Sequence, residues 1–427
     1  MKLTHFLTTK FFLLTLLTLF LFCVGVFGTN LVLGTAKPTN ATFWNYQCID
    51  TMKSSRDMAR SMMGSTGAQN QITTQIVAIK NLGANCVAID TPYDSEFLPI
   101  LTLWVTTARQ YNLHIWFRGN FSSWEGWFDY PTNMTTLQNL QDTKSFILRN
   151  PQLFQDGDIF TEAPEAENGG PFLNKESSSI APYRQFLIDE YQNENDAFSQ
   201  IHKSIVTNWF SMSGGWAKAV LDKPTIDAIG DNVTIDHYVK SPSEMCDYIS
   251  YFNNTFHSKV TLGEFGAPIP DINGDMTDAQ QADFVSKLFT CLYHDKNDIS
   301  GINYWDIMYG STALLSDNGA AKPVDQVIKN YYLPYVVNGK VNNVLGEGIA
   351  NATVTSQDGL NSTQTNQNGD FELPVARNTQ SISVTSPNYF NQEASVISNN
   401  AAPMQITMKR QTNDFWYNLD QFFHHLF

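Results

Sequence analysis

The chain has 427 residues, a formal net charge of −15 at pH 7 and only 16% charged residues. This length exceeds one small domain and fits a single α/β barrel with an accessory module. An acidic, weakly charged chain argues against nucleic acid as a partner, because nucleic-acid recognition requires a basic patch. Aromatic residues make up 13% of the chain, which suits stacking against a ligand and equally suits a packed core.

The first 28 residues predict an export segment. Lys2 and Lys10 precede an uninterrupted apolar run over residues 11–28, and small residues before Thr29 would allow cleavage there. The run is also long enough to span a bilayer, so a retained N-terminal membrane anchor is the alternative to a cleaved signal peptide. Cleavage is favoured. Either way we expect the protein to be secreted or to lie on the extracellular face of the cell envelope, with no other membrane contact.

Five cysteines occur, and Cys23 lies in the export segment. The other four show no CxxC spacing, so zinc is not indicated, and we expect neither a metal nor another cofactor. A Cys246–Cys291 disulfide could form in an exported protein, because their helices should be neighbours around a barrel. The sequence nevertheless favours buried free thiols.

After a Pro/Thr/Asn-rich linker at residues 30–40, short apolar strands alternate with amphipathic helices. The expected strands cover residues 42–49, 86–89, 113–117, 158–160, 205–210, 232–238, 258–262 and 302–305. The expected helices cover residues 69–83, 95–111, 136–149, 183–203, 242–256, 277–294 and 322–331, with a short connection at 219–230. Apolar parallel strands need cover on both faces, so this order predicts an α/β fold, a closed (β/α)8 TIM barrel within residues 29–335.

From residue 337 the pattern changes to a period of two, with a turn about every ten residues. This predicts a small all-β, antiparallel sandwich of about seven strands over residues 336–410. Its few aromatic residues favour a spacer or stabilising module over a carbohydrate-binding one. Residues 411–427 place apolar side chains at helical spacing and predict an amphipathic aromatic helix. We expect this helix to dock on protein, because no basic face accompanies it.

Side chains at the carboxyl ends of barrel strands converge on one rim. The rim residues expected here combine acids, bases and aromatic rings: Asp90, Tyr93, Arg118, Glu162, Trp209, Asp236, His237, Tyr238, Glu264 and Trp305. Glu162 and Glu264 follow the fourth and seventh strands, so their carboxyl groups could approach to the ~5 Å of a retaining glycosidase pair. In such a pair one carboxyl group donates a proton to the leaving group and the other attacks.

The barrel part of the chain resembles the clan A glycoside hydrolases, which are retaining (β/α)8 enzymes, and most of all family 5. The resemblance rests on Phe160-Thr-Glu-Ala-Pro164, where the clan usually shows Asn-Glu-Pro, on Gly263-Glu-Phe-Gly266 and on Tyr304-Trp305. It implies Glu162 as acid/base, Glu264 as nucleophile, Tyr238 as a hydrogen-bond donor to the nucleophile, Trp305 as sugar platform, and Arg118 and Asp90 as orienting groups. Tyr93, Trp209 and His237 complete the expected substrate-binding set.

Two features depart from the clan pattern. Thr161 stands where the clan has Asn, with Ala163 between Glu162 and the proline, and the sixth strand reads Asp236-His-Tyr238 rather than His-x-Tyr. The cluster of Glu162, Glu165 and Glu167 also leaves the acid/base open. Glu162 is preferred because it lies nearest the strand end, and Glu165 is the second candidate.

The predicted function is a monomeric retaining glycosidase that cleaves β-linked oligosaccharides or polysaccharides. The alternative is an inactive barrel that binds glycan without cleaving it. The C-terminal domain resembles carboxypeptidase regulatory-like β-sandwich modules, through Gly339-Lys-Val341, Ala352-Thr-Val354 and Asn368-Gly-Asp-Phe371.

Overall fold

The structure is a computed structural model that describes residues 33–38, 42–173, 179–397 and 403–411. They form two compact units, a barrel within residues 39–334 and a β unit built from residues up to 38 and from 335 onward. The export segment and the aromatic tail helix expected from the sequence lie outside the described residues. None of the described helices has the length and apolar character needed to cross a membrane.

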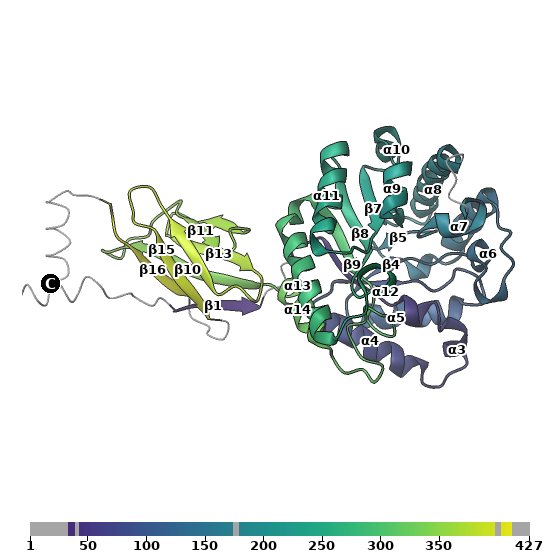
Figure 1. Cartoon of the computed structure of the whole chain (residues 1–427), viewed down its shortest axis with the longest axis horizontal. Coiled ribbons are helices and arrows are strands. Elements are labelled where there is room, and N and C mark those ends of the chain that lie inside the picture. Colours follow the sequence, from purple (N-terminus) through teal and green to yellow (C-terminus); the bar gives the residue numbers. More distant parts are fainter. Residues whose placement is uncertain (1–32, 39–41, 174–178, 398–402, 412–427) are drawn as a thin grey trace, which may run out of the picture. The chain divides into compact units, whose positions relative to one another are not determined.

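Eight parallel strands form the inner ring of the barrel unit, and helices surround them (Figure 1). The strands are β2 (Tyr46–Asp50), β3 (Cys86–Ile89), β4 (His114–Phe117), β5 (Ile159–Phe160), β6 (Ser211–Ser213), β7 (Asn232–Asp236), β8 (Lys259–Phe265) and β9 (Ile299–Tyr304). Their order is β5-β4-β3-β2-β9-β8-β7-β6. The predicted (β/α)8 barrel is confirmed.

The ring closes between β5 and the segment that leads into β6. Ile159 pairs with Val206 in an isolated parallel bridge, and the Val206 N–H donates to the Asp158 carbonyl at 2.9 Å. The strand expected over residues 205–210 is thus reduced to this bridge, and regular pairing to β7 begins only at Ser211. The chain therefore bends between its contacts with the two neighbouring strands.

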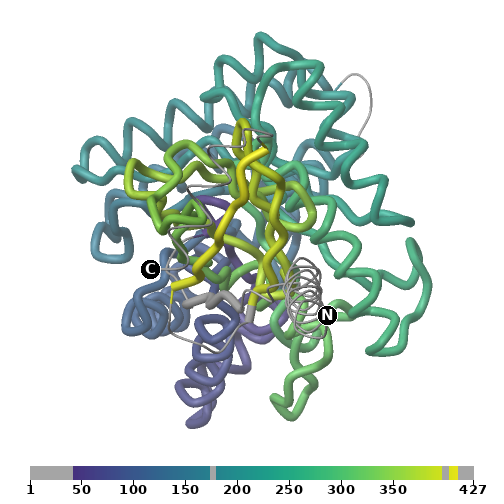
Figure 2. The backbone as a smooth tube through the Cα atoms, turned by 90° about the vertical axis from the view of Figure 1, so that its left-hand side faces the viewer, coloured from purple at the N-terminus to yellow at the C-terminus, as the bar shows by residue number. Residues whose placement is uncertain are grey.

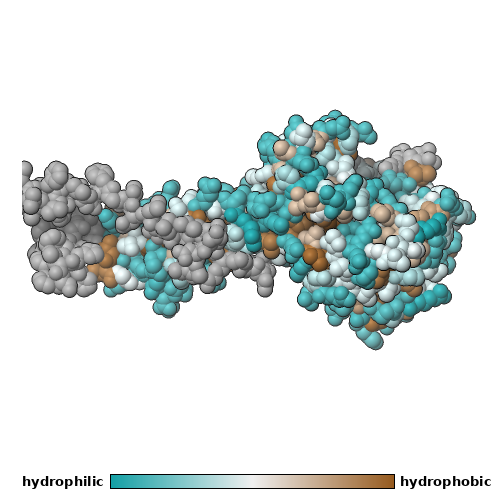
Figure 3. Space-filling model, turned by 90° about the horizontal axis from the view of Figure 1, so that it is seen from below, coloured by the Kyte–Doolittle hydropathy of each residue, from teal (hydrophilic) through white to brown (hydrophobic). Residues whose placement is uncertain are grey.

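The covering helices follow the predicted alternation. They are α2 (Met52–Ser55), α3 (Ala59–Met63), α4 (Ala68–Leu82), α5 (Leu98–Gln110), α6 (Ser122–Glu125), α7 (Thr136–Arg149), α8 (Ile180–Gln200), α9 (Gly214–Val220), α10 (Lys223–Ala228), α11 (Pro242–Phe256), α12 (Pro270–Asn273), α13 (Asp278–His294) and α14 (Pro323–Tyr332). Their apolar faces pack on the strands, and the face of the barrel unit in Figure 3 shows mostly hydrophilic and neutral residues with scattered apolar ones.

The prediction of free thiols was wrong. Cys48 on β2 bonds to Cys86 on the neighbouring strand β3, and Cys246 on α11 bonds to Cys291 on α13. The second bridge links helices that pack side by side. It is the Cys246–Cys291 disulfide that the sequence analysis gave as the less favoured alternative. Both bridges span long loops of chain, 38 and 45 residues, so each restricts the unfolded chain considerably.

The β unit contains eight strands: β1 (Leu33–Pro38), β10 (Tyr335–Asn343), β11 (Thr353–Ser356), β12 (Ser362–Gln364), β13 (Asp370–Val375), β14 (Ser381–Thr385), β15 (Gln392–Ile397) and β16 (Met404–Met408). Figure 2 shows its yellow C-terminal strands running side by side. Alternate side chains of these strands enclose a separate apolar core that includes Val341, Phe371 and Ile406. Seven of the strands come from the predicted sandwich region.

Strand β1 corrects the interpretation of residues 30–40 as a linker. Residues 33–38 lie inside the sheet of the β unit, antiparallel to β10 and parallel to β15. The pairing of β10 with β16 is also parallel, so the sheet is mixed rather than purely antiparallel. The barrel is therefore inserted between the first strand of the β unit and the rest of that unit.

We predict that Thr35→Pro selectively destabilises the β unit. Thr35 pairs with Asn338 on one side and Ile397 on the other. Proline removes a backbone donor from the middle of the sheet, and a buried group left without its hydrogen bond costs about 1–3 kcal/mol. Scanning calorimetry should show one unfolding transition lowered and the other unchanged. Thr35→Ala, which retains the N–H, is the control, and equal behaviour of both variants would show that β1 does not hold this sheet together.

Candidate active site

Strand β8 contains a bulge that directs Glu264 to the barrel mouth. Ile235 pairs with Leu262, but the next residue, Asp236, pairs with Glu264, so Gly263 is an extra residue in β8. A Cβ atom at Gly263 would overlap with the Asp236 carboxylate. The Gly263 carbonyl accepts hydrogen bonds from the Arg118 guanidinium and from Asn303 Nδ2. Glycine suits this position because the side chains of Asp236, Ser211 and Thr234 occupy the space that a Cβ atom would take.

Arg118, one residue after β4, is the centre of the site. Its side chain is fully buried, and Nη2 donates to Asp236 Oδ2 at 2.9 Å and to Glu264 Oε1 at 3.1 Å. The carboxylates of Asp50 and Asp90 lie 3.6 and 4.0 Å from the guanidinium. One cation thus holds together four acidic side chains that come from four different strands or strand ends.

Four carboxylates exceed what one guanidinium can neutralise, so the cluster must retain protons. Burial and the neighbouring Asp50 hold the pKa of Asp90 well above its usual range, and Asp90 is the group we expect to stay protonated. Burial and Asp236 raise the pKa of Glu264 to about 8, while Arg118 opposes the rise. With a pKa of about 8, Glu264 can ionise close to neutral pH.

The second oxygen of Glu264 faces Tyr238, which follows β7. The Tyr238 hydroxyl donates to Glu264 Oε2 at 2.8 Å, and its ring lies edge-on to Trp305, with centroids 6.0 Å apart. Tyr238 and Trp305 are half-buried, and Glu264 keeps 8% of its surface exposed. Glu264, Tyr238 and Trp305 therefore lie together at the mouth, with a carboxylate oriented through both of its oxygens.

The assignment of Glu162 as acid/base needs correction. Side chains alternate along β5 and its extension, and Ile159 and Thr161 point into the barrel. The Thr161 hydroxyl accepts from the Trp116 indole at 2.9 Å and donates to the Trp209 carbonyl at 2.8 Å. Glu162 consequently points outward, where it is fully buried beside Glu190 and Glu194 of α8.

Glu165, the second candidate, lies close enough to Glu264 for the two carboxyl groups to interact electrostatically. Burial, Asp236 and Glu264, in that order, hold the pKa of Glu165 well above its usual range, so its carboxyl group lies in the field of the Glu264 carboxylate. Its side chain is part-exposed, and Oε2 accepts from Asn168 at 2.7 Å. Its backbone has a left-handed φ of 50°, and its N–H donates to the Ser211 carbonyl at 2.9 Å.

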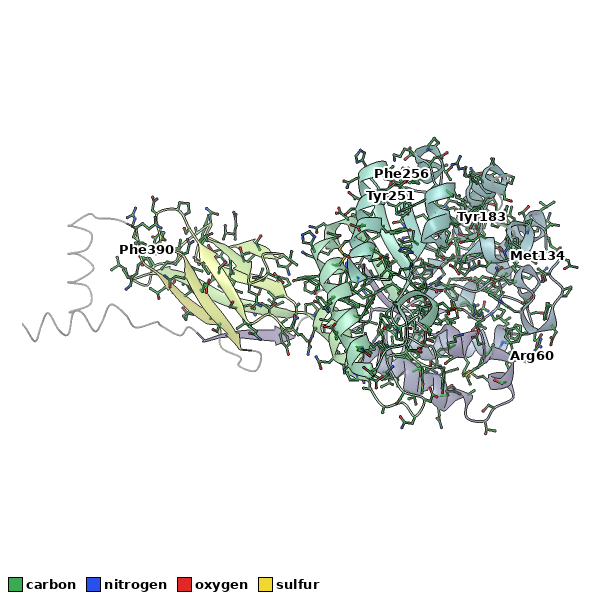
Figure 4. The ribbon with its side chains drawn as sticks, viewed as in Figure 1. Arg60, Met134, Tyr183, Tyr251, Phe256 and Phe390 are labelled. Carbon is green, nitrogen blue, oxygen red and sulfur yellow. A yellow bond between two sulfur atoms is a disulfide. The ribbon has the colours of Figure 1, made fainter. Side chains whose placement is uncertain are left out.

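Glu167 secures the loop that carries Glu165. It is fully buried, and it accepts from the Ser213 N–H at 2.8 Å and from the Tyr183 hydroxyl at 2.9 Å. Tyr183 belongs to the first turn of α8 and is labelled in Figure 4. The loop is thereby tied to both β6 and α8, which fixes the position of Glu165.

Two further predicted substrate contacts lie away from the mouth. The Tyr93 hydroxyl donates to the Thr161 carbonyl, and its ring stacks on Phe160, in the layer between the strands and the outer helices. The His237 ring packs 3.8 Å from that of Tyr248 on α11, and burial lowers its pKa to about 4. Both residues support the barrel rather than face a ligand.

Trp209 is also misplaced as a substrate contact. It is 4% exposed and belongs to the apolar cluster inside the barrel, with its ring edge-on to Trp116 at 4.9 Å. A Cβ atom on Gly301 would collide with this ring. Trp209 therefore fills the barrel interior below the mouth.

A chain of contacts that the sequence does not indicate links Trp305 at the mouth to Trp127. The Lys53 ammonium lies 5.7 Å from the centroid of the Trp305 ring, and the Arg56 guanidinium lies 4.8 Å from that of Trp127. Asp57 forms ion pairs with both cations. Trp127 and Trp305 are thus joined through the segment 53–57. The polar composition of this segment does not predict these contacts.

Two more acidic residues were missed. Burial raises the pKa of Glu125, beside Arg56, to about 7, and burial together with Asp50 raises that of Asp306 to about 8. Asp306 directly follows Trp305, so its place after a strand was a usable signal. Glu125 lies in the four-residue helix α6, which is too short for a hydrophobic pattern to show which way its side chains point.

Two groups of potential metal ligands occur among the described residues, and neither lies at the mouth. One is Cys246, Cys291 and Asp295, whose sulfur atoms form a disulfide. The other is Glu162, Glu190 and Glu194, on the outer side of the strands. The side chains that the structure brings together at the mouth carry carboxyl, guanidinium, phenol and indole groups.

Neither a protein-family model nor a curated protein sequence matches the chain. In three dimensions it is similar to a GH5_18 protein from Streptomyces cattleya in complex with GlcNAc, at 12% identity over 68% of this chain and 80% of that one, with a TM-score of 0.51. It is also similar to one chain from a structural study of two fungal β-1,4-galactanases, at 14% identity over 67% of this chain and 99% of that one, with a TM-score of 0.48. At 12% identity the likeness to the GH5_18 protein shows a shared fold and nothing finer.

We predict that Gly263→Ala destabilises the barrel by about 1–3 kcal/mol, because the new methyl group must displace the buried Asp236 carboxylate. Chemical denaturation should measure the loss. The control is Gly215→Ala in α9, where a Cβ atom meets nothing within 4 Å and helix propensity favours alanine. Equal stability of wild type and Gly263→Ala would mean that the bulge does not need glycine.

Proposed function

We propose that the protein is a retaining glycoside hydrolase that cleaves β-linked glycans, with Glu264 as nucleophile and Glu165 as acid/base. The observation that carries this proposal is the environment of Glu264. Its two oxygens are bound by Arg118 and Tyr238, while the part-exposed Glu165 lies in its electrostatic field. Two carboxyl groups with distinct environments at a barrel mouth supply what a double displacement requires.

In the first step, the Glu264 carboxylate attacks the anomeric carbon while Glu165 donates its proton to the glycosidic oxygen. The C–O bond to the leaving group breaks, and a glycosyl ester forms on Glu264. Arg118 and Tyr238 hold the attacking carboxylate in one orientation, so little reorganisation is needed.

In the second step, Glu165 acts as a base on water. Formation of the ester removes the negative charge of Glu264, which is one of the causes that keep the pKa of Glu165 high. The pKa of Glu165 therefore falls once the intermediate has formed, and the carboxylate can accept a proton from the water that hydrolyses the ester. The electrostatic interaction between Glu264 and Glu165 thus switches Glu165 from acid to base.

We assign the sugar-stacking surfaces to Trp305 and Trp127. Both are half-buried, and the segment containing Lys53 and Arg56 connects them. Aromatic faces combined with nearby charged donors suit the apolar faces and hydroxyl groups of sugar rings.

The two disulfides support an oxidising, extracellular compartment. Secretion, cleavage of the export segment and the monomeric state remain predictions. The spacer role of the β unit agrees with the aromatic residues of its described part, where Phe371 is buried and Phe390, labelled in Figure 4, is 55% exposed.

We predict that Glu264→Ala lowers kcat/KM on β-glycans by ~10⁴-fold or more, because no attacking group remains. Azide should restore turnover of aryl β-glycosides by attacking from the vacated side, and NMR should show a glycosyl azide of inverted configuration. Wild type should release a sugar of retained configuration. An inverted wild-type product would contradict the mechanism, and a wild type that binds glycans without cleaving any of a broad β-glycan panel would favour the inactive barrel.

We predict that Glu165→Gln lowers kcat/KM more strongly the more basic the leaving group of the substrate is. Polysaccharides should lose about 10²–10⁴-fold in kcat/KM, whereas dinitrophenyl glycosides, which leave without a proton, should still form the intermediate rapidly. The comparison variant is Glu162→Gln, whose effects should be independent of the leaving group. If the dependence appears with Glu162→Gln instead, the assignment of the acid/base to Glu165 is wrong.

The raised pKa of Glu264 predicts a pH profile shifted to the alkaline side. The nucleophile must be ionised, so kcat/KM should fall as the pH drops below about 8, and it should fall again at higher pH when Glu165 loses its proton. Because the Tyr238 hydrogen bond lowers the pKa of Glu264, Tyr238→Phe should move the acidic limb to still higher pH. An acidic limb near pH 4.5 in wild type, unmoved in the variant, would contradict this.

A further inference from the structure

Three glutamates lie together outside the catalytic mouth, between β5 and α8. Glu162 follows β5, and Glu190 and Glu194 lie one turn apart on the same face of α8. Their exposed fractions are 0%, 1% and 0%. Each offers a carboxylate oxygen, and these three oxygens all lie within 4.8 Å of one another.

The cluster has no protein cation to balance it. Among the residues that the structure describes, no ion pair includes any of the three glutamates. Both oxygens of Glu162, both of Glu194 and Oε1 of Glu190 are buried without a hydrogen-bond partner of good geometry. The backbone N–H groups of Ala163 and Glu162 lie beside Glu190 and Glu194 and lower their pKa values, but they carry no full positive charge. Burial and mutual repulsion raise the pKa values of these carboxyl groups. Unpartnered buried carboxylates are rare because they lose hydration without compensation.

A fourth oxygen lies beside this cluster. Thr143 of α7 is fully buried, its hydroxyl has no hydrogen-bond partner of good geometry, and it lies next to the Glu162 carboxyl group, whose pKa it lowers. Helix α7 packs directly on α8. A neutral oxygen from a second helix therefore lies beside Glu162, so the side chains of the cluster offer oxygen ligands from three parts of the fold.

We propose that Glu162, Glu190 and Glu194, with the Thr143 hydroxyl, form a structural binding site for a hard divalent cation, with Ca²⁺ as the preferred ion. Ca²⁺ binds oxygen ligands at about 2.3–2.6 Å, so opposite ligands in one shell lie roughly 4.6–5.2 Å apart. The 4.8 Å limit on the three carboxylate oxygens agrees with one such shell. Mg²⁺ needs shorter, octahedral contacts and retains water, which suits a sealed site less well.

The position of the site gives the cation a structural role. Glu162 lies three residues before Glu165, so an ion held between Glu162 and α8 would fix the outer side of the loop whose inner side Glu167 ties to β6. The inference does not rest on the proposed hydrolysis. A protein that binds the ion but cleaves no glycan would refute the proposed function and leave this site intact.

The test uses the full chain, purified, treated with EDTA and dialysed into metal-free buffer. We expect elemental analysis after re-dialysis against Ca²⁺ to show one tightly held equivalent, and Ca²⁺ to raise the melting temperature more than Mg²⁺ at equal concentration. Glu190→Gln and Glu194→Gln should each reduce Ca²⁺ affinity at least tenfold. Asp189→Asn, on the same helix but outside the cluster, should respond to Ca²⁺ as wild type does.

Two results would overturn the proposal. One is a wild type that holds no stoichiometric Ca²⁺, Mg²⁺ or Mn²⁺ and whose melting temperature none of these ions changes. The other is Ca²⁺ binding that persists undiminished in Glu194→Gln, which would place the ion elsewhere. If the glutamine variants do not fold, equilibrium titration of wild type with Ca²⁺ decides the first point, and Glu194→Asp, which retains the charge but shortens the side chain, decides the second through its affinity.

Discussion

The buried guanidinium of Arg118 is the interaction on which the site depends. It reaches from the end of β4 to the Gly263 carbonyl and to the carboxylates of Asp236 and Glu264 on the opposite strands. Removing it would leave several acids in one dry space, and buried carboxylates without a partner are far more costly than an unmade surface ion pair. The arginine therefore determines both the shape of the mouth and the number of protons that the acidic cluster holds.

The backbone bulge at Gly263 and the charged cluster around Arg118 depend on each other. The bulge at Gly263 turns its carbonyl toward Arg118 and Asn303 and lets Glu264 pair with Asp236. Without the extra residue, the side-chain alternation of β8 would point Glu264 to the opposite face of the strand. The nucleophile proposed here is thus a product of one irregular residue in an otherwise regular strand.

The sequence predicted the barrel because each strand and helix has its own local period, and it predicted Glu264, Arg118, Tyr238 and Trp305 because each directly follows a strand or ends one. The sequence did not predict which face of a strand the Glu162 side chain points to. It also did not predict which segments pair when they lie far apart in the chain. Glu162 follows the strand more closely than Glu165, yet the alternation set by Thr161 turns it outward. The pairing of Thr35 with Asn338, and the bridge between Cys48 and Cys86, join segments whose local patterns carry no information about each other.

The loop from Thr161 to Glu167 shows how the fold keeps a strained residue at a defined position. Glu165 adopts a left-handed backbone that an ordinary side chain disfavours. Its N–H is bound to the Ser211 carbonyl, Thr161 is fixed from inside the barrel, and Glu167 is bound by Ser213. Because the flanking residues on both sides are held independently, the conformation of Glu165 is imposed by its surroundings. An acid/base on such a loop keeps its position even as its charge changes between the two steps of the reaction.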